Sequence, residues 1–504
     1  MMTDDANAEA GADAANTDGS PATSTAPSPT GRRSASAQIG RFLGTWKGLV
    51  ALYLIFAGAY LGASGGRLRQ HSAYNHYVYL AEGWLHGRLA LAGAPPNEND
   101  WAKVDVLALR DGRTVRGTYG GRGGPTDRFY PLRGHTETIA AADIVSRSTI
   151  RYVSFPPLPA VLMLPFVAIA GLGFNDVLFT ALWAAVNPVL LFLLLRALGR
   201  RGLSKRSSTE DLWLTVLFGV GSVYYYCSVV GEVWFTAHVV AVTTVIGFAW
   251  SAVDARAPGR AGLLVGLALA SRPNPGFGFM SLLFVWEAVR TTGALTVVAG
   301  RRRFVLNRAL RLKLAGFGAS LAAVVMVLLV HNMARFAQPF EFGHRYLNVQ
   351  WQERIQRFGL FNYHFLSRNL AAALILLPRV LSKWPFVKIS QHGMSLFVTS
   401  PTLGYTVVPA ERSRLAMPLW LTVLGVALPP LLYQNSGYVQ FGYRFSLDYM
   451  VFLVMILAVG NRPLSRLFKT LVVVSIPINL FLAIIFDRYM DFSYDDSFFP
   501  HGFN

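Results

Sequence analysis

The segment QHSAYNHYVYLAEGWLHGRLAL (Gln70–Leu91) directly follows the first long apolar run of the chain. It is too polar to cross a bilayer, because ionisable side chains interrupt it at His71, His76, Glu82, His86 and Arg88. From Tyr77 onward its apolar residues recur at helical spacing, which predicts an amphipathic helix. We expect this helix to lie on the outer membrane surface with its aromatic face in the headgroups.

This surface helix has two possible roles. If the protein has a reaction site, the helix is expected to form one wall of it. The alternative is an interfacial anchor without chemistry.

The composition identifies a polytopic membrane protein. Of the 504 residues, 53% are hydrophobic and 14% are charged, and many apolar runs are long enough to cross about 30 Å of hydrocarbon. The net charge of +19 does not indicate nucleic-acid binding, because much of the basic excess sits in short loops between apolar runs. The single cysteine, Cys227, excludes an intramolecular disulfide and a cysteine-rich metal site.

The basic loops set the expected topology. Loops 195–208, 254–260, 290–313, 411–414 and 461–469 are basic, so they should be cytoplasmic. This alternation predicts about eleven crossings, with a cytoplasmic N-terminus and an external C-terminus. The expected spans are 46–63, 176–198, 211–229, 234–253, 260–271, 275–290, 312–332, 393–409, 415–433, 444–461 and 468–486.

Two apolar segments are left over from this set of crossings, and one of the predicted spans is short. If only one of 155–172 and 370–381 crossed, the charge pattern would invert, so we predict that both are juxtamembrane or re-entrant helices on the outer side. The alternative is that they cross as a pair. The span 260–271 is short, and with the next span it brackets Arg272 and Pro273, so this pair can dip in from the outside and make a cavity.

The chain divides into five parts by composition. Residues 1–38 should be a disordered cytoplasmic tail, and 39–96 hold the first span and the surface helix. Residues 97–153 are expected to form an external β-rich insertion, because VDVLALRDGRTVRGTY (Val104–Tyr119) alternates apolar and polar residues around an Asp-Gly turn. Residues 154–487 form the polytopic domain, and 488–504 an external tail.

The acidic side chains of the insertion could belong to a metal site or to a solvated surface. Their spacing matches no metal-ligand pattern, so we favour the solvated surface. The residues concerned are Asp100, Asp105, Asp111, Asp127, His135, Glu137 and Asp143.

Polar and aromatic residues concentrate on the predicted outer side, which suits a lipid-linked substrate. Arginine binds phosphate through bidentate, charge-assisted hydrogen bonds, and a carboxylate or histidine can accept a proton from a hydroxyl group. The candidates are Arg272, Arg345 and Arg444 for a donor phosphate, Glu232, Glu82 and His76 for catalysis, and Asn75, Trp234, His238 and Tyr443 for substrate binding.

Each candidate also has an interpretation without function. The arginines at span ends can snorkel to the interface. The carboxylates can be loop charges in water, and His76 can face the headgroups.

The order of several segments resembles the GT-C superfamily of polytopic glycosyltransferases, which includes protein O-mannosyltransferases and lipid A aminoarabinose transferases. The resemblance covers most of Trp46–Asp487. The segments are YNHYVYLAEGWLHGRLAL, FPPLPAVLMLPFVAIAGLG, GEVWFTAHVVAV, GLALASRPNPG and FGYRFSLDYMVFLVMI.

The resemblance implies an all-α membrane fold of roughly 11–13 helices with outer-face juxtamembrane helices, a polyprenyl-phosphate sugar donor and transfer on the outer face. The sequence departs from the family at Asn75, where such enzymes usually carry an acidic residue. Asparagine cannot act as a base, so Glu82, Glu232 or an acidic residue of the insertion would have to take that role.

The sequence therefore predicts a membrane glycosyltransferase that moves a sugar from a polyprenyl phosphate to an acceptor hydroxyl outside the cytoplasm, in a bacterial plasma membrane. Expected partners are the donor lipid, membrane lipids and a glycan, lipid or protein acceptor, with no nucleic acid and with a divalent metal ion as an open option. The alternatives are a transporter or flippase for lipid-linked sugars and a catalytically inactive binding protein. We find no internal repeat, which a transporter should show, so the enzyme is favoured.

Overall fold

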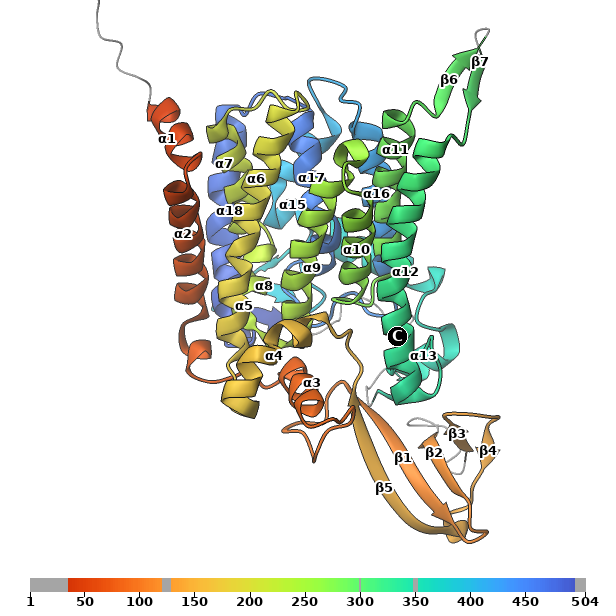
Figure 1. Cartoon of the computed structure of the whole chain (residues 1–504). Coiled ribbons are helices and arrows are strands. Elements are labelled where there is room, and N and C mark those ends of the chain that lie inside the picture. The colour runs from red at the N-terminus through yellow and green to blue at the C-terminus, as the bar shows by residue number, and fades with distance from the viewer. Residues whose placement is uncertain (1–34, 120–127, 299–300, 348–351, 495–504) are drawn as a thin grey trace, which may run out of the picture.

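A computed structural model describes residues 35–119, 128–298, 301–347 and 352–494, and it shows a helical bundle with a β-sheet at one end (Figure 1). We call this end of the bundle the sheet end. Helix α1 (Ala35–Leu43) covers residues 35–38, which the sequence predicted to be disordered. The rest of that predicted tail, and residues 495–504 of the predicted external tail, lie outside the described residues.

Five helical segments of the described chain are long and apolar enough to cross a membrane. A sixth is counted if α7 (Ser208–Gly219) and α8 (Tyr224–Val230), which are bent by 55°, form one span. The five are Trp46–Arg69 (α2, Trp46–Ser64, and the turn after it), Asp176–Arg200 (α5, Asp176–Ala184, and α6, Val186–Arg200), Glu232–Ala255 (α9, Glu232–Ala252, and the turn after it), Arg308–Phe336 (α12) and Arg466–Ile485 (α18). The protein is thus a helical membrane protein, whereas eleven crossings remain a prediction.

Further predicted spans are shorter helices that lie in the same bundle (Figure 1). They are α10 (Pro258–Leu269), α11 (Ser281–Thr291), α16 (Ala416–Leu432) and α17 (Leu447–Val459).

The span expected at 393–409 is not a continuous helix. It consists of the single turn α15 (Leu396–Thr399) and a 3-10 segment, Pro401–Val407. Pro401 lacks an N–H group and so disfavours continuation of the helix. The buried hydroxyl of Ser400 at the break donates instead to the carbonyl of Gly221 at 2.9 Å. This non-helical backbone is satisfied by neighbouring protein, as it must be within a membrane.

The two remaining apolar segments take different forms. Helix α4 (Leu158–Ala170) packs against α3 (His76–Leu85), and both lie between the bundle and the sheet (Figure 1). The helix expected over 370–381 ends early, because α14 (Leu366–Leu374) is followed by Pro378 and the strand β8 (Arg379–Val380). Strand β8 pairs with β9 (Val387–Ser390), which pairs with β10 (Ser493–Tyr494).

The predicted β-rich insertion is confirmed as a five-stranded antiparallel sheet of order β4-β3-β2-β1-β5. Its strands are β1 (Trp101–Leu109), β2 (Thr114–Tyr119), β3 (Arg128–Pro131), β4 (Glu137–Thr138) and β5 (Ile144–Val153). The sheet is anchored to the bundle by the end of α12, where Phe336 packs on Tyr152 and the guanidinium of Arg335 donates to the carbonyl of Val153. A separate hairpin, β6 (Leu295–Val298) and β7 (Arg301–Phe304), projects from the opposite end of the bundle (Figure 1).

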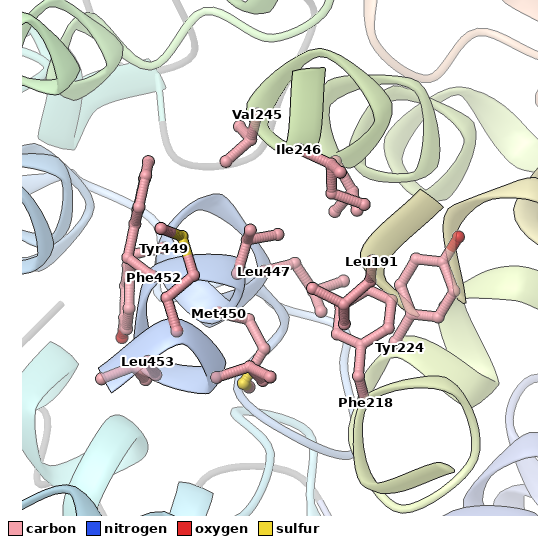
Figure 2. Close-up of a cluster of buried hydrophobic side chains, with 14 of the residues drawn as sticks. Leu191, Phe218, Tyr224, Val245, Ile246, Leu447, Tyr449, Met450, Phe452 and Leu453 are labelled. Atoms are coloured by element: carbon pink, nitrogen blue, oxygen red, sulfur yellow. The ribbon is translucent and has the colours of Figure 1, made fainter. Parts of the chain in front are cut away.

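Helix α17 is the centre of the bundle. Every residue from Leu447 to Val459 is buried, which explains why this helix is apolar on all faces. Figure 2 shows its side chains meeting those of α6, α7, α8 and α9. The labelled side chains are Leu191, Phe218, Tyr224, Val245, Ile246, Leu447, Tyr449, Met450, Phe452 and Leu453.

Ion pairs join three of the basic loops opposite the sheet end. The fully buried carboxylate of Glu287 accepts two hydrogen bonds from Arg414 at 2.6 Å, and two from Arg290 at 3.1 and 3.2 Å. Asp254 accepts from the same two arginines at 2.8 and 2.6 Å. These loops therefore share one end, as the charge pattern requires, and the assignment of that end to the cytoplasm remains a prediction.

We predict that Gly262→Ala loosens the contact between α10 and α12. A Cβ at Gly262 would collide with the carbonyl oxygen of Phe317, and overpacking of this kind costs about 1–3 kcal/mol. Gly318→Ala in α12 is the matched control, because a Cβ there meets nothing within 4 Å. Thermal unfolding in detergent should show a lower Tm for the first variant and an equal or higher Tm for the second. Equal Tm values for the two would contradict this packing.

Candidate functional site

A cavity of about 360 Å³ opens at the sheet end of the bundle. The start of α9, the loop before α11, the segment 430–445 and the residues after α18 all contribute to its wall. Its charged lining residues are Asp100, Glu232, Arg272, Arg444 and Asp487. Its aromatic lining residues are Tyr74, Phe155, Trp234, Phe235, Phe361, Tyr433, Tyr438, Phe441, Phe445 and Phe486. A mixed charged and aromatic lining can hold a ligand that combines an anionic group with a ring or an apolar portion.

A buried polar network positions the side chain of Arg272. Its Nε lies 3.1 Å from Oδ1 of Asp448, a residue of α17 that is 1% exposed. Asn274 donates to the other oxygen of Asp448 at 2.7 Å. His238 of α9 contacts Arg272 through its Nε2, and its Nδ1 lies 3.4 Å from Asp448. The network fixes the direction in which the guanidinium of Arg272 faces the cavity.

Arg444 is positioned by backbone and aromatic contacts. Its backbone N–H donates to Oε1 of Gln440 at 2.9 Å, and Gln440 donates in turn to the carbonyls of His392 at 2.9 Å and Ser436 at 2.7 Å. The guanidinium lies 5.7 Å from the ring centre of Phe445, and that of Arg272 lies 5.0 Å from the same ring. One aromatic ring therefore contacts both cations, a favourable cation–π arrangement.

Glu232 is the first residue of α9 and lines the cavity. The turn before it is tight, since Gly231 has φ 73° and Glu232 has φ 56°. Asp176 fastens this turn, because its carboxylate accepts from the N–H of Glu232 at 3.3 Å and from Ser72 at 2.7 and 2.6 Å. Within the described chain, no hydrogen bond or ion pair occupies the Glu232 carboxylate, which leaves it available to a ligand.

Asp100 precedes β1 and is directed to the cavity by Trp234, whose indole N–H donates to its Oδ2 at 2.9 Å. Burial raises the pKa of Asp100 to about 6, although the hydrogen bond from Trp234 and the charge of Arg444 oppose this shift. Burial also raises the pKa of Asp487, against the charge of Arg67. Asp100 therefore titrates near neutral pH.

The interpretation of the insertion's acidic residues as a solvated surface is wrong for two of them. Asp100 lines the cavity, and Asp105 is buried and accepts from Arg147 at 2.8 Å and Thr149 at 2.9 Å. Asp127 lies outside the described residues. Across the described ranges, no group of three or more His, Cys, Asp or Glu side chains is arranged to hold a metal ion.

Four of the ten candidate residues from the sequence line the cavity, namely Glu232, Arg272, Arg444 and Trp234. His238 lies behind Arg272 in the polar network. Tyr443 and Asn75 are buried and do not line the cavity. The side chain of Arg345 is 63% exposed, with its Nε 3.8 Å from Glu341.

The surface helix α3 does not form a wall of the cavity, contrary to the sequence-based expectation. Tyr74, just before it, lines the cavity. Glu82 is paired with Arg88 at 3.1 Å and His86 at 3.0 Å. His76 stacks on Trp101 with ring centres 3.9 Å apart, and burial lowers its pKa to about 4. The apolar face of α3 packs on α4 and the sheet, which is why these residues turn away from the cavity.

Sequence reasoning missed Asp448 and Asp487. Asp448 offered a signal, because it is one charged residue in the apolar run from Leu447 to Val459, and an ionisable group in such a run is a functional candidate by default. Asp487 offered none, since it stands at the start of a polar, aromatic segment.

No family model and no curated protein matches the chain. Among solved structures, the chain is similar to the Archaeoglobus fulgidus oligosaccharyltransferase in its apo form, with 12% identity and a TM-score of 0.37 over 90% of this chain and 55% of that one. It is also similar to that enzyme tethered by a disulfide to an acceptor peptide with the NVT sequon, with 12% identity and a TM-score of 0.35 over 88% and 54%. The chain thus spans about half the length of these structures. Similarity this low carries no argument about function.

We predict that Asp448→Asn strongly destabilises the protein, because it leaves the guanidinium of Arg272 without its buried partner. Removing one member of a buried ion pair costs about 3–5 kcal/mol. Asp111→Asn is the control, since Asp111 pairs with Arg113 on the surface, where a pair contributes about 0–1 kcal/mol. Thermal unfolding should show a large fall in Tm for Asp448→Asn alone, and the double variant Arg272→Met/Asp448→Leu should recover part of it. A Tm for Asp448→Asn that matches the control would show that the network is dispensable.

Proposed function

We propose that this protein is an integral membrane glycosyltransferase that moves a sugar from a polyprenyl phosphate to an acceptor hydroxyl at the sheet end of the bundle, outside the cytoplasm. The observation that carries the proposal is the cavity lining, where two arginines and three acidic residues border one space beside aromatic rings. The order of the GT-C-like segments in the sequence supports it independently.

Arg272 and Arg444 are the proposed phosphate ligands. A phosphodiester carries one negative charge, and a planar guanidinium can bind two of its oxygens at once. Asp448 already balances Arg272, whereas Arg444 forms no ion pair with a described residue. Arg444 should therefore contribute the larger share of the binding energy.

Asp100 is the proposed base. The acceptor oxygen forms a bond to the anomeric carbon while the bond from that carbon to the phosphate oxygen breaks and the acceptor proton passes to Asp100. The polyprenyl phosphate leaves with the bonding electron pair as a stable anion, so no separate acid is needed. A base works best when its pKa lies close to the working pH, and the pKa of about 6 for Asp100 meets that condition.

Glu232 and Trp234 are the proposed sugar contacts. A carboxylate without a partner accepts hydrogen bonds from sugar hydroxyls, and an indole ring stacks on the apolar face of a sugar ring. The polyprenyl tail of the donor would stay in the membrane, against the apolar helices beside the cavity.

The asparagine at position 75 does not by itself indicate an inactive protein. Its side chain is buried and does not line the cavity, whereas Asp100 and Glu232 do. We therefore favour catalysis over binding alone.

We predict that Arg444→Gln weakens binding of undecaprenyl phosphate by about 10- to 100-fold, because hydrogen bonds to charged groups contribute about 1.5–3 kcal/mol. Arg345→Gln is the matched control, since Arg345 is exposed and does not line the cavity. Binding is measured in nanodiscs by native mass spectrometry or thermophoresis. If Arg345→Gln weakened binding and Arg444→Gln did not, the phosphate would lie elsewhere.

We predict that Asp100→Asn lowers the transfer rate by about 10²- to 10⁴-fold, the range typical of a general base. The assay uses proteoliposomes and a panel of polyprenyl-phosphate sugars, with Asp111→Asn as the control. In the unaltered protein the rate should rise with pH through about 6, because Asp100 must be unprotonated to accept a proton. If only Glu232→Gln abolished transfer, the base would be Glu232.

A further inference from the structure

An exposed apolar hairpin lies beside the cavity and has no role in the reaction proposed above. It runs from the end of α14 through β8 to the start of β9. Val380 is 85% exposed and Trp384 is 68% exposed. The large exposed apolar side chains of this segment are Leu374, Ile375, Leu377, Val380, Leu381, Trp384 and Phe386. A group of exposed large apolar side chains this close together in the chain indicates an interaction surface.

The hairpin belongs to the sheet end of the bundle. Its second strand, β9, pairs with β10, which follows the end of α18. Between α18 and β10 lie Asp487 and Met490, both of which line the cavity. Trp384 packs against Phe492 with ring centres 5.5 Å apart. The hairpin is thus attached to the segment after α18, which forms one wall of the cavity.

The charged side chains of the hairpin itself are all basic, although Asp491 lies in the neighbouring segment beside Phe492. Residues 354–410 contain no Asp or Glu, and Arg379, Lys383 and Lys388 flank the apolar side chains. The ring of Tyr494 lies 3.9 Å from the guanidinium of Arg379, whereas Lys383 is exposed at the tip. Apolar side chains with lysine and arginine beside them match an interface of acyl chains and anionic headgroups.

We propose that this hairpin is a lipid-docking element that inserts Val380, Leu381, Trp384 and Phe386 into the headgroup region of an anionic leaflet. The inserted hairpin places lipid next to Met490 and so closes that side of the cavity against water. This inference goes beyond the proposed function, because it holds whether or not the chain transfers a sugar.

The test measures the membrane depth of a label on the exposed strand β8 of the hairpin. Val380→Cys in a Cys227→Ala background is labelled with an environment-sensitive fluorophore, and the full chain is reconstituted into vesicles of phosphatidylcholine and phosphatidylglycerol. Nitroxide lipids labelled near the headgroup should quench the label by about twofold or more, and more strongly than lipids labelled deep in the acyl chain. The control label sits at Ser146→Cys, on an exposed position of β5, and should be quenched by neither lipid.

Two further results decide the proposal. Lys383→Glu with Lys388→Glu should reduce the quenching in anionic vesicles and leave it unchanged in pure phosphatidylcholine. The proposal is overturned if the label at position 380 behaves like the label at position 146, or if the charge-reversed variant is quenched as strongly as the parent in anionic vesicles. It is also overturned if oxidation of the unlabelled Val380→Cys variant links two chains through position 380 in high yield, since a second copy would then cover the hairpin.

Discussion

The buried pair of Arg272 and Asp448 is the interaction on which the cavity depends. The two residues come from segments far apart in sequence, and each would be costly to bury alone. Asp448 stands on α17, the helix that is buried on every side, so its position is set by the core shown in Figure 2. Through Asn274 and His238 it also fixes the loop before α11 and the first half of α9. Packing at the centre of the bundle thereby determines where a positive charge faces the cavity.

A second constraint acts on the backbone. Three carboxylate residues that line the cavity, Asp100, Glu232 and Asp487, have positive φ values of 59°, 56° and 53°. This left-handed region is unfavourable for side chains other than glycine, although aspartate tolerates it better than most. Such residues persist where their surroundings hold them, and they concentrate at functional sites. Two of the three are stabilised by hydrogen bonds. The indole N–H of Trp234 donates to Asp100, and Asp176 accepts from the backbone N–H of Glu232.

The sequence predicted the helices better than it predicted the site. Hydropathy and charge located most of the bundle's helices, because a membrane segment needs its apolar length wherever it packs. They failed at 393–409, where a proline breaks the helix and neighbouring protein satisfies the backbone. They also failed at α3, since an amphipathic pattern does not say whether the polar face meets a cavity or a neighbouring loop. For that reason Glu82 and His76 do not line the cavity. Glu232, Arg272 and Arg444 do line it, and they were selected because the charge pattern put all three on the predicted outer side.

The charges of the cavity explain why these positions form one site. The negative charge of Asp448 neutralises the positive charge of Arg272, so this pair is nearly neutral before a ligand binds. Arg444 lies above the rings of Phe235 and Phe445, which stabilise a cation without supplying a negative charge. It therefore keeps its attraction for an anion. Asp100 lies on the same lining and would repel a phosphate from its own side, so the proposed anionic ligand would bind with its phosphate at Arg444 and its uncharged portion toward Trp234. In the proposed reaction, the bond between sugar and phosphate would then lie between the arginines and Asp100, an arrangement that would bring the acceptor hydroxyl close to the anomeric carbon.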